Sequence, residues 1–240
     1  MRKAIVIAVL LALAISFVGT PEALAQSEGG QGKKITMWQT LMWGGWIGFT
    51  ILGLSVVGMG LVIEHAISIR RDALVPPDLL GNLESLFEDE EFEEAMQICE
   101  TQPTFLTNVL AAGLPKINQG YEEIEKAMQE VGEQEAVRLH QKIGYLSLIA
   151  NVSPMMGLLG TVAGMIGAFN TIATKQGAAN PSDLAGDISK ALVTTFLGLT
   201  VAIPLTAAFF YFRNRVIRII LEVGAISGEM MERFKTHGKG

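Results

Sequence analysis

The stretch IANVSPMMGLLGTVAGM at Ile149–Met165 decides the fold of this chain. It lies inside about thirty residues without a charged side chain, Ile143–Thr174, a length that can cross a bilayer. Small and polar residues interrupt this run at helical spacing (i, i+4, i+7 and i+11), which places them on one face. These residues are Gly157, Thr161, Gly164 and Ala168. The stretch therefore predicts a membrane-spanning helix with a seam of small residues.

A second uncharged segment, Ala191–Phe212, repeats this pattern. Small residues let membrane helices approach each other closely, because lipid provides no hydrophobic drive for their association. Two interpretations are open: the seams only pack helices, or the hydroxyls of Thr161 and Thr195 also line a polar path. The helix-packing seam predicted from both segments consists of Gly157, Gly160, Gly164, Ala191, Gly198 and Ala202.

The two segments also resemble a known family. The sequences GLLGTV at Gly157–Val162 and ALVTTFLGLTVAIP at Ala191–Pro204 are similar to those of the MotA/TolQ/ExbB proton channel family, most of all its ExbB/TolQ branch. The order of one span, a hydrophilic domain and two spans with these motifs matches from about Trp43 to the C-terminus. The resemblance implies a proton-channel subunit in a pentameric ring, with Thr161 and Thr195 at the positions of the family's pore threonines.

The N-terminus has the pattern of a signal peptide over residues 1–25. Arg2 and Lys3 precede an apolar run, Ala4–Val18, and an A-x-A cleavage site ends the segment. The alternative is a retained fourth helix, although the apolar run is short for a span. Residues 26–43 then form a polar periplasmic lead to the first span.

The charge distribution predicts the topology of three spans, placed at residues 44–66, 144–172 and 188–212. Basic residues flank the spans at Arg70, Arg71, Arg138, Lys142, Arg213, Arg215 and Arg218. By the positive-inside rule these clusters face the cytoplasm. The mature N-terminus and the loop at 173–187 are then periplasmic, and the helix at 213–240 is cytoplasmic. We predict a multi-pass protein of the bacterial inner (plasma) membrane.

The hydrophilic segment at residues 67–143 is predicted to be a helical cytoplasmic domain. Arg70–Lys142 contains sixteen acidic and six basic residues, and the whole chain has a net charge of -6. Such a charge repels nucleic acid. The second and third spans continue into the cytoplasm with one apolar face each, which several copies packed side by side would bury. The predicted fold class is an all-α integral membrane protein that assembles into an oligomer in the lipid bilayer.

The sequence has no recognisable constellation of catalytic or metal-binding residues. Its histidines, His65, His140 and His237, have no cysteine or carboxylate at metal-ligand spacing. The glycines of residues 157–164 lie in a membrane segment, which argues against a nucleotide-binding loop. The single cysteine, Cys99, cannot form an intrachain disulfide. We therefore predict that the chain is not an enzyme and uses neither a metal nor a cofactor.

A proton path across a bilayer normally requires an ionisable group, and the cores of the three spans have none. A threonine hydroxyl donates and accepts hydrogen bonds but does not titrate near neutral pH. If the chain conducts protons, the carboxylate must come from another chain. The family resemblance implies that a single-span ExbD/TolR-like partner brings a membrane aspartate into the ring, and that a TonB/TolA-like protein is a further partner.

One position departs from the family pattern. Lys190 stands where the family typically has a glutamate, one turn before the third-span threonine. Asp187 lies three residues earlier, so it either pairs with Lys190 or stands in for the missing acid. Pro154 and Pro204 each remove a backbone hydrogen bond within a span, and we predict a kink at each.

Two functions fit these observations. The first is a subunit that, with an Asp-bearing single-span partner, converts proton motive force into mechanical work. That work would drive outer-membrane transport (ExbB-like) or maintain envelope integrity (TolQ-like). The alternative is a non-conducting oligomeric membrane scaffold. The two differ in one requirement, because only the conductor needs the hydroxyls of Thr161 and Thr195.

Overall fold

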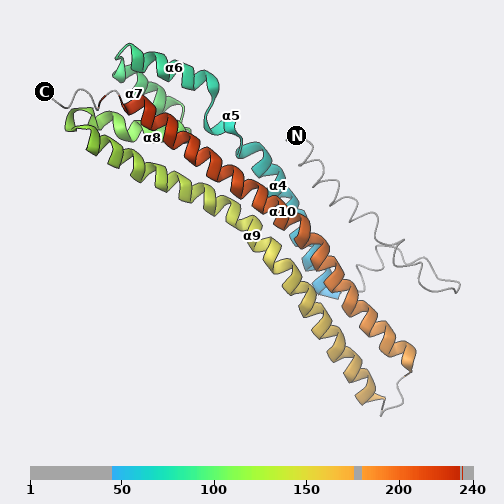
Figure 1. Cartoon of the computed structure of the whole chain (residues 1–240). Coiled ribbons are helices and arrows are strands. Elements are labelled where there is room, and N and C mark those ends of the chain that lie inside the picture. The colour runs from blue at the N-terminus through green and yellow to red at the C-terminus, as the bar shows by residue number, and fades with distance from the viewer. Residues whose placement is uncertain (1–44, 176–179, 233, 235–240) are drawn as a thin grey trace. The chain divides into compact units, whose positions relative to one another are not determined.

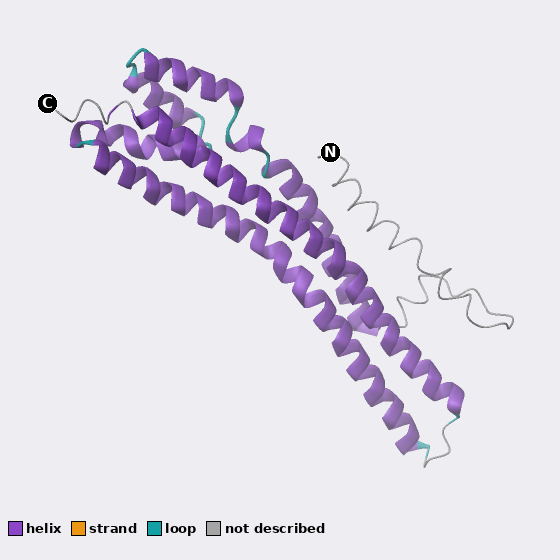
Figure 2. Cartoon of the chain, viewed as in Figure 1, coloured by secondary structure: helices purple, strands orange, loops and turns teal. Residues whose placement is uncertain are grey.

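The computed structural model describes residues 45–175, 180–232 and 234, and the regular elements in these residues are helices (Figure 2). In chain order they are α4 (Gly45–Ser68), α5 (Arg71–Leu74), α6 (Pro77–Glu88), α7 (Phe92–Thr101), α8 (Phe105–Gly113), the 3-10 helix η2 (Leu114–Gln119), α9 (Tyr121–Thr174) and α10 (Pro181–Glu232). The predicted all-α class is confirmed for the described residues. The predicted signal peptide and periplasmic lead lie outside them.

Among the described residues, three helices are long and apolar enough to cross a membrane: Gly45–Ser68, Tyr121–Thr174 and Leu184–Glu232. By length and composition, the three predicted spans of this part of the chain are therefore confirmed as helices. Because α9 has 54 residues and α10 has 52, each is far longer than the roughly 20 residues that a span requires. Each of these two helices therefore has an apolar part and a charged part, and they run side by side (Figure 1).

The chain divides into two compact units. The first, here called the span unit, contains the described residues of 45–64 and 145–210. The second, the hydrophilic unit, contains residues 65–144 and the described residues from Tyr211 onward. Helices α4, α9 and α10 contribute to both units, whereas α5 to α8 belong to the hydrophilic unit alone.

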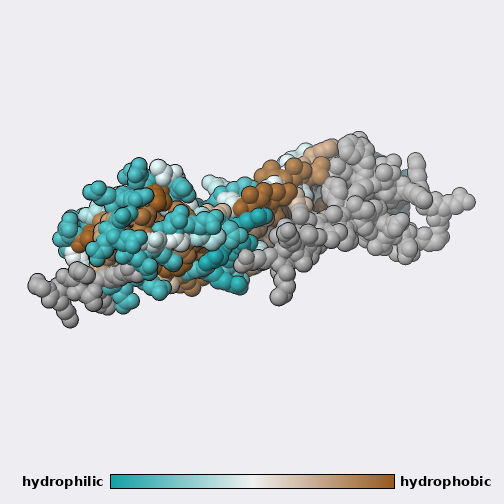
Figure 3. Space-filling view, turned by 90° about the horizontal axis from the view of Figure 1, so that it is seen from above, coloured by the Kyte–Doolittle hydropathy of each residue, from teal (hydrophilic) through white to brown (hydrophobic). Residues whose placement is uncertain are grey.

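In the span unit, α4 packs against α10 through a glycine. A Cβ atom at Gly58 would lie 2.7 Å from Cδ1 of Leu205, so the leucine side chain fills the space that the glycine leaves. Leu205 and Ile51 are buried here. Large apolar side chains are exposed on the outer surface and include Trp46, Val56, Met155, Leu158, Phe169 and Ile203. Figure 3 shows hydrophobic surface (brown) beside the grey atoms. Such a surface is one that lipid or another protein chain covers.

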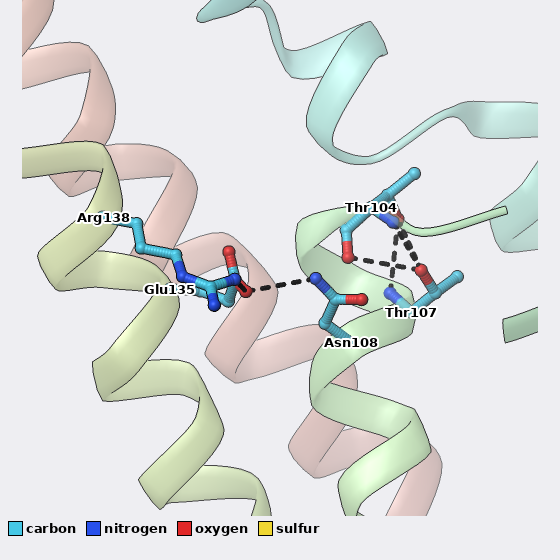
Figure 4. A network of polar contacts seen from close by, with 5 residues as sticks. All are labelled: Thr104, Thr107, Asn108, Glu135 and Arg138. Atoms are coloured by element: carbon cyan, nitrogen blue, oxygen red, sulfur yellow. Dashed lines mark hydrogen bonds and ion pairs between the residues drawn. The ribbon is translucent and has the colours of Figure 1, made fainter. Parts of the chain in front are cut away.

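In the hydrophilic unit, α6, α7 and α8 each bury apolar residues on one face. Leu79, Leu83 and Phe87 are the buried residues of α6. Helix α8 begins with a capping box, in which the Thr107 N–H donates to Thr104 Oγ1 at 3.3 Å and the Thr104 N–H donates to Thr107 Oγ1 at 2.7 Å (Figure 4). The capping box satisfies backbone donors that a helix start leaves without partners, and so fixes where α8 begins.

Polar contacts connect the helices of the hydrophilic unit. Asn108 Nδ2 donates to Glu135 Oε1 at 3.2 Å and joins α8 to α9, and Arg138 forms an ion pair with the same carboxylate at 2.6 Å (Figure 4). Arg71 of α5 forms an ion pair with Glu222 of α10, also at 2.6 Å. Within this unit, these contacts join α8 to α9 and α5 to α10.

A buried histidine connects three helices at one end of the hydrophilic unit. The side chain of His65 is 1% exposed. Its Nε2 lies 3.0 Å from the carbonyl oxygen of Lys142 and must donate, since a carbonyl can only accept. The imidazole also meets the ring of Phe212 edge to face, with centroids 5.7 Å apart. Lys142 Nζ donates to Ser68 Oγ at 2.6 Å beside it.

Candidate functional site

The seam between α9 and α10 brings the two backbones into direct contact. A Cβ atom at Gly198 would lie 2.6 Å from the carbonyl oxygen of Ser153, and one at Gly157 would lie 2.9 Å from Cα of Thr195. Backbone atoms cannot give way as a flexible side chain does, so only glycine fits at these two positions. Ser153 itself is buried and its hydroxyl donates to the Ile149 carbonyl at 2.7 Å.

The same seam continues along both helices. A Cβ atom at Gly160 would collide with the side chain of Thr194, and one at Gly164 would lie 2.5 Å from Cβ of Ala191. Ala202 of the predicted seam is also buried. The structure therefore places all six predicted seam residues inside the span unit, and their contacts pair the glycines of α9 with small residues and threonines of α10.

Two adjacent threonines of α10 face the seam. Thr195 Oγ1 donates to the carbonyl oxygen of Gly157 across the seam at 2.9 Å. Thr194 is almost fully buried and donates to the carbonyl oxygen of Ala191 at 2.7 Å, with the Gly157 carbonyl 3.4 Å away. The sequence reasoning missed Thr194. Its position one helical turn after Ala191 was the available signal, since the two residues share a face.

Thr161 has a different environment from Thr195. It is half-buried, and its hydroxyl donates to the carbonyl oxygen of Leu158 in its own helix at 2.7 Å. Among the described residues no hydrogen bond joins Thr161 to Thr195. The structure of a single chain therefore leaves Thr161 beside the seam, with its hydroxyl oxygen available to accept a hydrogen bond from another molecule.

The charged pair at the start of α10 also contacts α9. Lys190 Nζ donates to Asp187 Oδ1 at 3.2 Å. The Thr171 hydroxyl shares its proton between the Gly167 carbonyl at 3.0 Å and the other oxygen of this carboxylate at 3.4 Å. The Lys190 side chain is half-exposed. The three residues join the ends of α9 and α10 through a single carboxylate.

Both prolines lie inside continuous helices. Pro154 is within α9 and Pro204 is within α10, and each is half-buried. Because proline has no N–H, the carbonyls of Ala150 and Thr200 lose their donors in the helix. Unpaired carbonyls inside a membrane segment require another donor, such as a side chain or an ordered water.

Titratable groups are missing from the apolar stretches around the seam. Residues 45–63, 146–174 and 191–210 contain no Asp, Glu, Lys, Arg, His, Cys or Tyr. In the part of the chain that the structure describes, no three His, Cys, Asp or Glu side chains are grouped so that they could hold a metal ion. The chemistry that the seam offers is therefore hydrogen bonding by hydroxyls and carbonyls.

The fold and the seam define the class of protein: an integral membrane protein with three candidate spanning helices, two of which pack along a polar seam of glycines and threonines. The model of the MotA/TolQ/ExbB proton channel family matches residues 101–224, and the chain belongs to this family. The resemblance inferred from GLLGTV and ALVTTFLGLTVAIP is confirmed. The family and the three apolar helices indicate a protein of the inner membrane.

Two relatives agree with the ExbB-like branch. A protein of Methanothermobacter thermautotrophicus described as a biopolymer transport protein ExbB homolog is 28% identical over 174 residues, which are 72% of this chain and 61% of that protein. The biopolymer transport protein ExbB-like 3 of Synechocystis sp. is 27% identical over 178 residues, which are 74% of this chain and 85% of that protein. The first match thus leaves more than a third of the Methanothermobacter protein uncovered.

A solved structure has the same fold. The structure of C. jejuni MotAB matches with a TM-score of 0.60 at 16% sequence identity, and the match covers 95% of this chain and 89% of that chain. At this level of identity the likeness concerns the arrangement of the helices. It extends over the hydrophilic unit as well as the span unit.

Proposed function

We propose that the chain is an inner-membrane proton-channel subunit that works with a single-span ExbD/TolR-like partner carrying a membrane aspartate. Together they convert proton motive force into mechanical work for outer-membrane transport (ExbB-like) or envelope integrity (TolQ-like). The observation that carries this proposal is the seam, in which threonine hydroxyls lie in close-packed helices whose apolar stretches have no titratable group. Membership of a proton channel family supports proton conduction as the activity.

Each hydroxyl of the seam has a defined hydrogen-bond direction. Thr161 Oγ1 lies against the Leu158 carbonyl and Thr195 Oγ1 against the Gly157 carbonyl, and each hydroxyl must donate, because a carbonyl can only accept. With its proton committed, a hydroxyl can still accept a hydrogen bond. A protonated carboxylic acid can donate to it, whereas an ionised carboxylate finds no donor there.

Because these hydroxyls can only accept a further hydrogen bond, they favour a neutral carboxyl group beside the seam. An apolar surrounding without donors disfavours the charged form of an acid and raises its pKa. The partner's aspartate would therefore be held protonated while it contacts Thr161 and Thr195, and would lose its proton where water reaches it. One charge that crosses 100 mV releases about 2.3 kcal/mol, so the work per step requires several protons or tight coupling to motion.

The charge distribution and the family resemblance support one arrangement around this path. We propose a pentameric ring with the hydrophilic unit in the cytoplasm, the mature N-terminus in the periplasm and a cleaved signal peptide at residues 1–25. Pro154 and Pro204 would shape the path by bending its two helices. Asp187 and Lys190 would form an auxiliary charged pair at its periplasmic end. A TonB/TolA-like protein would receive the mechanical work.

The test combines co-purification with proton flux. The tagged chain is expressed at native level and extracted in mild detergent, and the small single-span proteins that accompany it are identified by mass spectrometry. The complex is then reconstituted into liposomes, and proton uptake is measured for the wild type and for Thr161→Val and Thr195→Val. Valine is close to threonine in size but lacks the hydroxyl, so we expect assembly without flux.

Thr206→Val is the matched control. Thr206 lies on α10, is exposed, and donates only to the Ala202 carbonyl of its own helix at 2.8 Å. This variant should conduct as the wild type does. If no partner with a membrane aspartate accompanies the chain, or if both seam variants conduct normally, the alternative proposal of a non-conducting membrane scaffold replaces this one.

A further inference from the structure

A groove of about 340 Å³ lies in the hydrophilic unit between α8, α9 and α10. Its lining includes the buried apolar residues Val109, Met128 and Val223. On α9, Glu125 and Glu133 border the groove two helical turns apart and so lie on the same side. The groove therefore combines an apolar floor with an acidic wall, and we call it the α8–α10 groove.

Two glycines of α10 line this groove, and no contact within the described residues requires glycine at either position. Gly224 and Gly228 are one turn apart, and a Cβ atom at either would meet nothing within 4 Å. Each weakens the helix relative to alanine. At Gly113 the chain itself explains the glycine, because a Cβ atom there would lie 2.7 Å from Sδ of Met128. The open glycine pair instead fits an occupant that approaches the α10 backbone closely.

The shape of the groove fits a helix. Its lining on α9 runs from Tyr121 to Ala136, a length of about 22 Å at 1.5 Å per residue. An amphipathic helix of three to four turns has this length and can place an apolar face on the floor. Val137 and Leu221 lie outside the groove lining and are 53% and 68% exposed, so exposed apolar residues extend past the groove on α9 and α10.

The charge of the groove lining indicates the occupant. Two of its side chains, Glu125 and Glu133, are acidic, and none is a lysine or an arginine. A second copy that docked here with its own groove would bring these glutamates together. A helix with lysines or arginines would instead complement Glu125 and Glu133.

We propose that the α8–α10 groove holds a cationic amphipathic helix from the cytoplasmic flank of the single-span partner. This inference rests on the proposed function, which supplies the partner and places the hydrophilic unit in the cytoplasm. The positive-inside rule gives the cytoplasmic flank of such a partner its lysines and arginines. The groove would thus hold the partner outside the bilayer.

The test is site-specific photocross-linking in the purified complex with the partner. A benzophenone amino acid replaces Gln129, which is exposed and lines the groove, and in a separate sample replaces Glu123, which is exposed on α9 and does not line it. We expect position 129 to cross-link to residues on the cytoplasmic side of the partner's span, at least tenfold more than position 123. A product with a second copy of this chain, or no product at position 129 while the partner co-purifies, overturns the inference.

Groove variants provide a second measurement. In the cross-linking background, Gly228→Leu fills the space above α10, and the double variant Glu125→Gln with Glu133→Gln removes the acidic wall. Each should lower the cross-link yield about tenfold while the partner still co-purifies through its span. Gly81→Leu is the matched control, because Gly81 of α6 also has nothing within 4 Å and lies outside the groove lining. Unchanged yields in the groove variants overturn the inference, and a complex without any single-span partner overturns the proposed function with it.

Discussion

The contact at Gly198 makes a quantitative prediction about the seam. In Gly198→Ala the new Cβ atom would lie 2.6 Å from the Ser153 carbonyl oxygen, whereas ordinary contact begins at 3.4 Å. The helices must therefore separate by about 0.8 Å at this point. The same movement would lengthen the hydrogen bond from Thr195 to Gly157 from 2.9 Å to about 3.7 Å, beyond hydrogen-bonding distance.

These changes have an expected cost. Overpacking typically costs about 1–3 kcal/mol, and an interhelical hydrogen bond in a membrane protein contributes about 0.6 kcal/mol. Alanine recovers up to about 1 kcal/mol through its higher helix propensity. The net loss in the free energy of unfolding should therefore be about 1–3 kcal/mol. SDS titration of the purified protein in mixed micelles, followed by tryptophan fluorescence, measures it.

Two other glycines calibrate this measurement. Gly167→Ala adds a Cβ atom with nothing within 4 Å, so it should leave the free energy of unfolding unchanged or slightly increase it. Gly58→Ala meets only the side chain of Leu205, which can rotate away, so its loss should be intermediate. The reasoning is refuted if Gly198→Ala is as stable as Gly167→Ala, because the backbone contact would then not be closely packed.

Two further predictions concern groups outside the seam. Burial raises the pKa of Cys99 from 9.0 to about 11, so at pH 8 the folded protein should react with iodoacetamide about a hundredfold more slowly than the unfolded protein. Because the folded state holds its thiol proton more tightly, this group should also lower stability as the pH rises from 9 to 11, which denaturation at several pH values measures. The pair of Asp187 and Lys190 is partly exposed, so Lys190→Gln should change the free energy of unfolding by less than about 1 kcal/mol in the same SDS titration. A loss above 2 kcal/mol would show instead that this pair is essential for joining α9 to α10.

Helical spacing predicts which face of a helix carries small residues, but not which atoms that face meets. It placed Gly157 and Gly198 on two faces, and the structure shows that these faces meet each other. It places Thr194 on the face of Ala191, one turn earlier, but it does not show that Thr194 is more deeply buried than its neighbour Thr195. The contact of Leu205 with Gly58 joins segments almost 150 positions apart, and the spacing of residues within one helix cannot predict such a contact.

The same limit applies to the hydrophilic unit. The spacing of Leu79, Leu83 and Phe87 predicts a helix, and these residues are the buried stripe of α6. The capping box at Thr104 and Thr107 that begins α8 depends on two side chains that bond each other's backbone, and the alternation of apolar residues carries no information about it. Nor does it predict the groove, since the open space beside Gly224 depends on where three helices lie.

The seam also shows why substitutions of glycine and of threonine answer different questions. A scaffold and a conductor both need Gly157 and Gly198, since either function requires the two helices to pack. Loss of activity in a glycine variant therefore does not distinguish them. The hydroxyl of Thr161 is different, because its hydrogen bond is to a carbonyl of its own helix. Its replacement by valine should leave the free energy of unfolding almost unchanged, so a loss of proton flux in that variant would be chemical in origin and would favour the conductor.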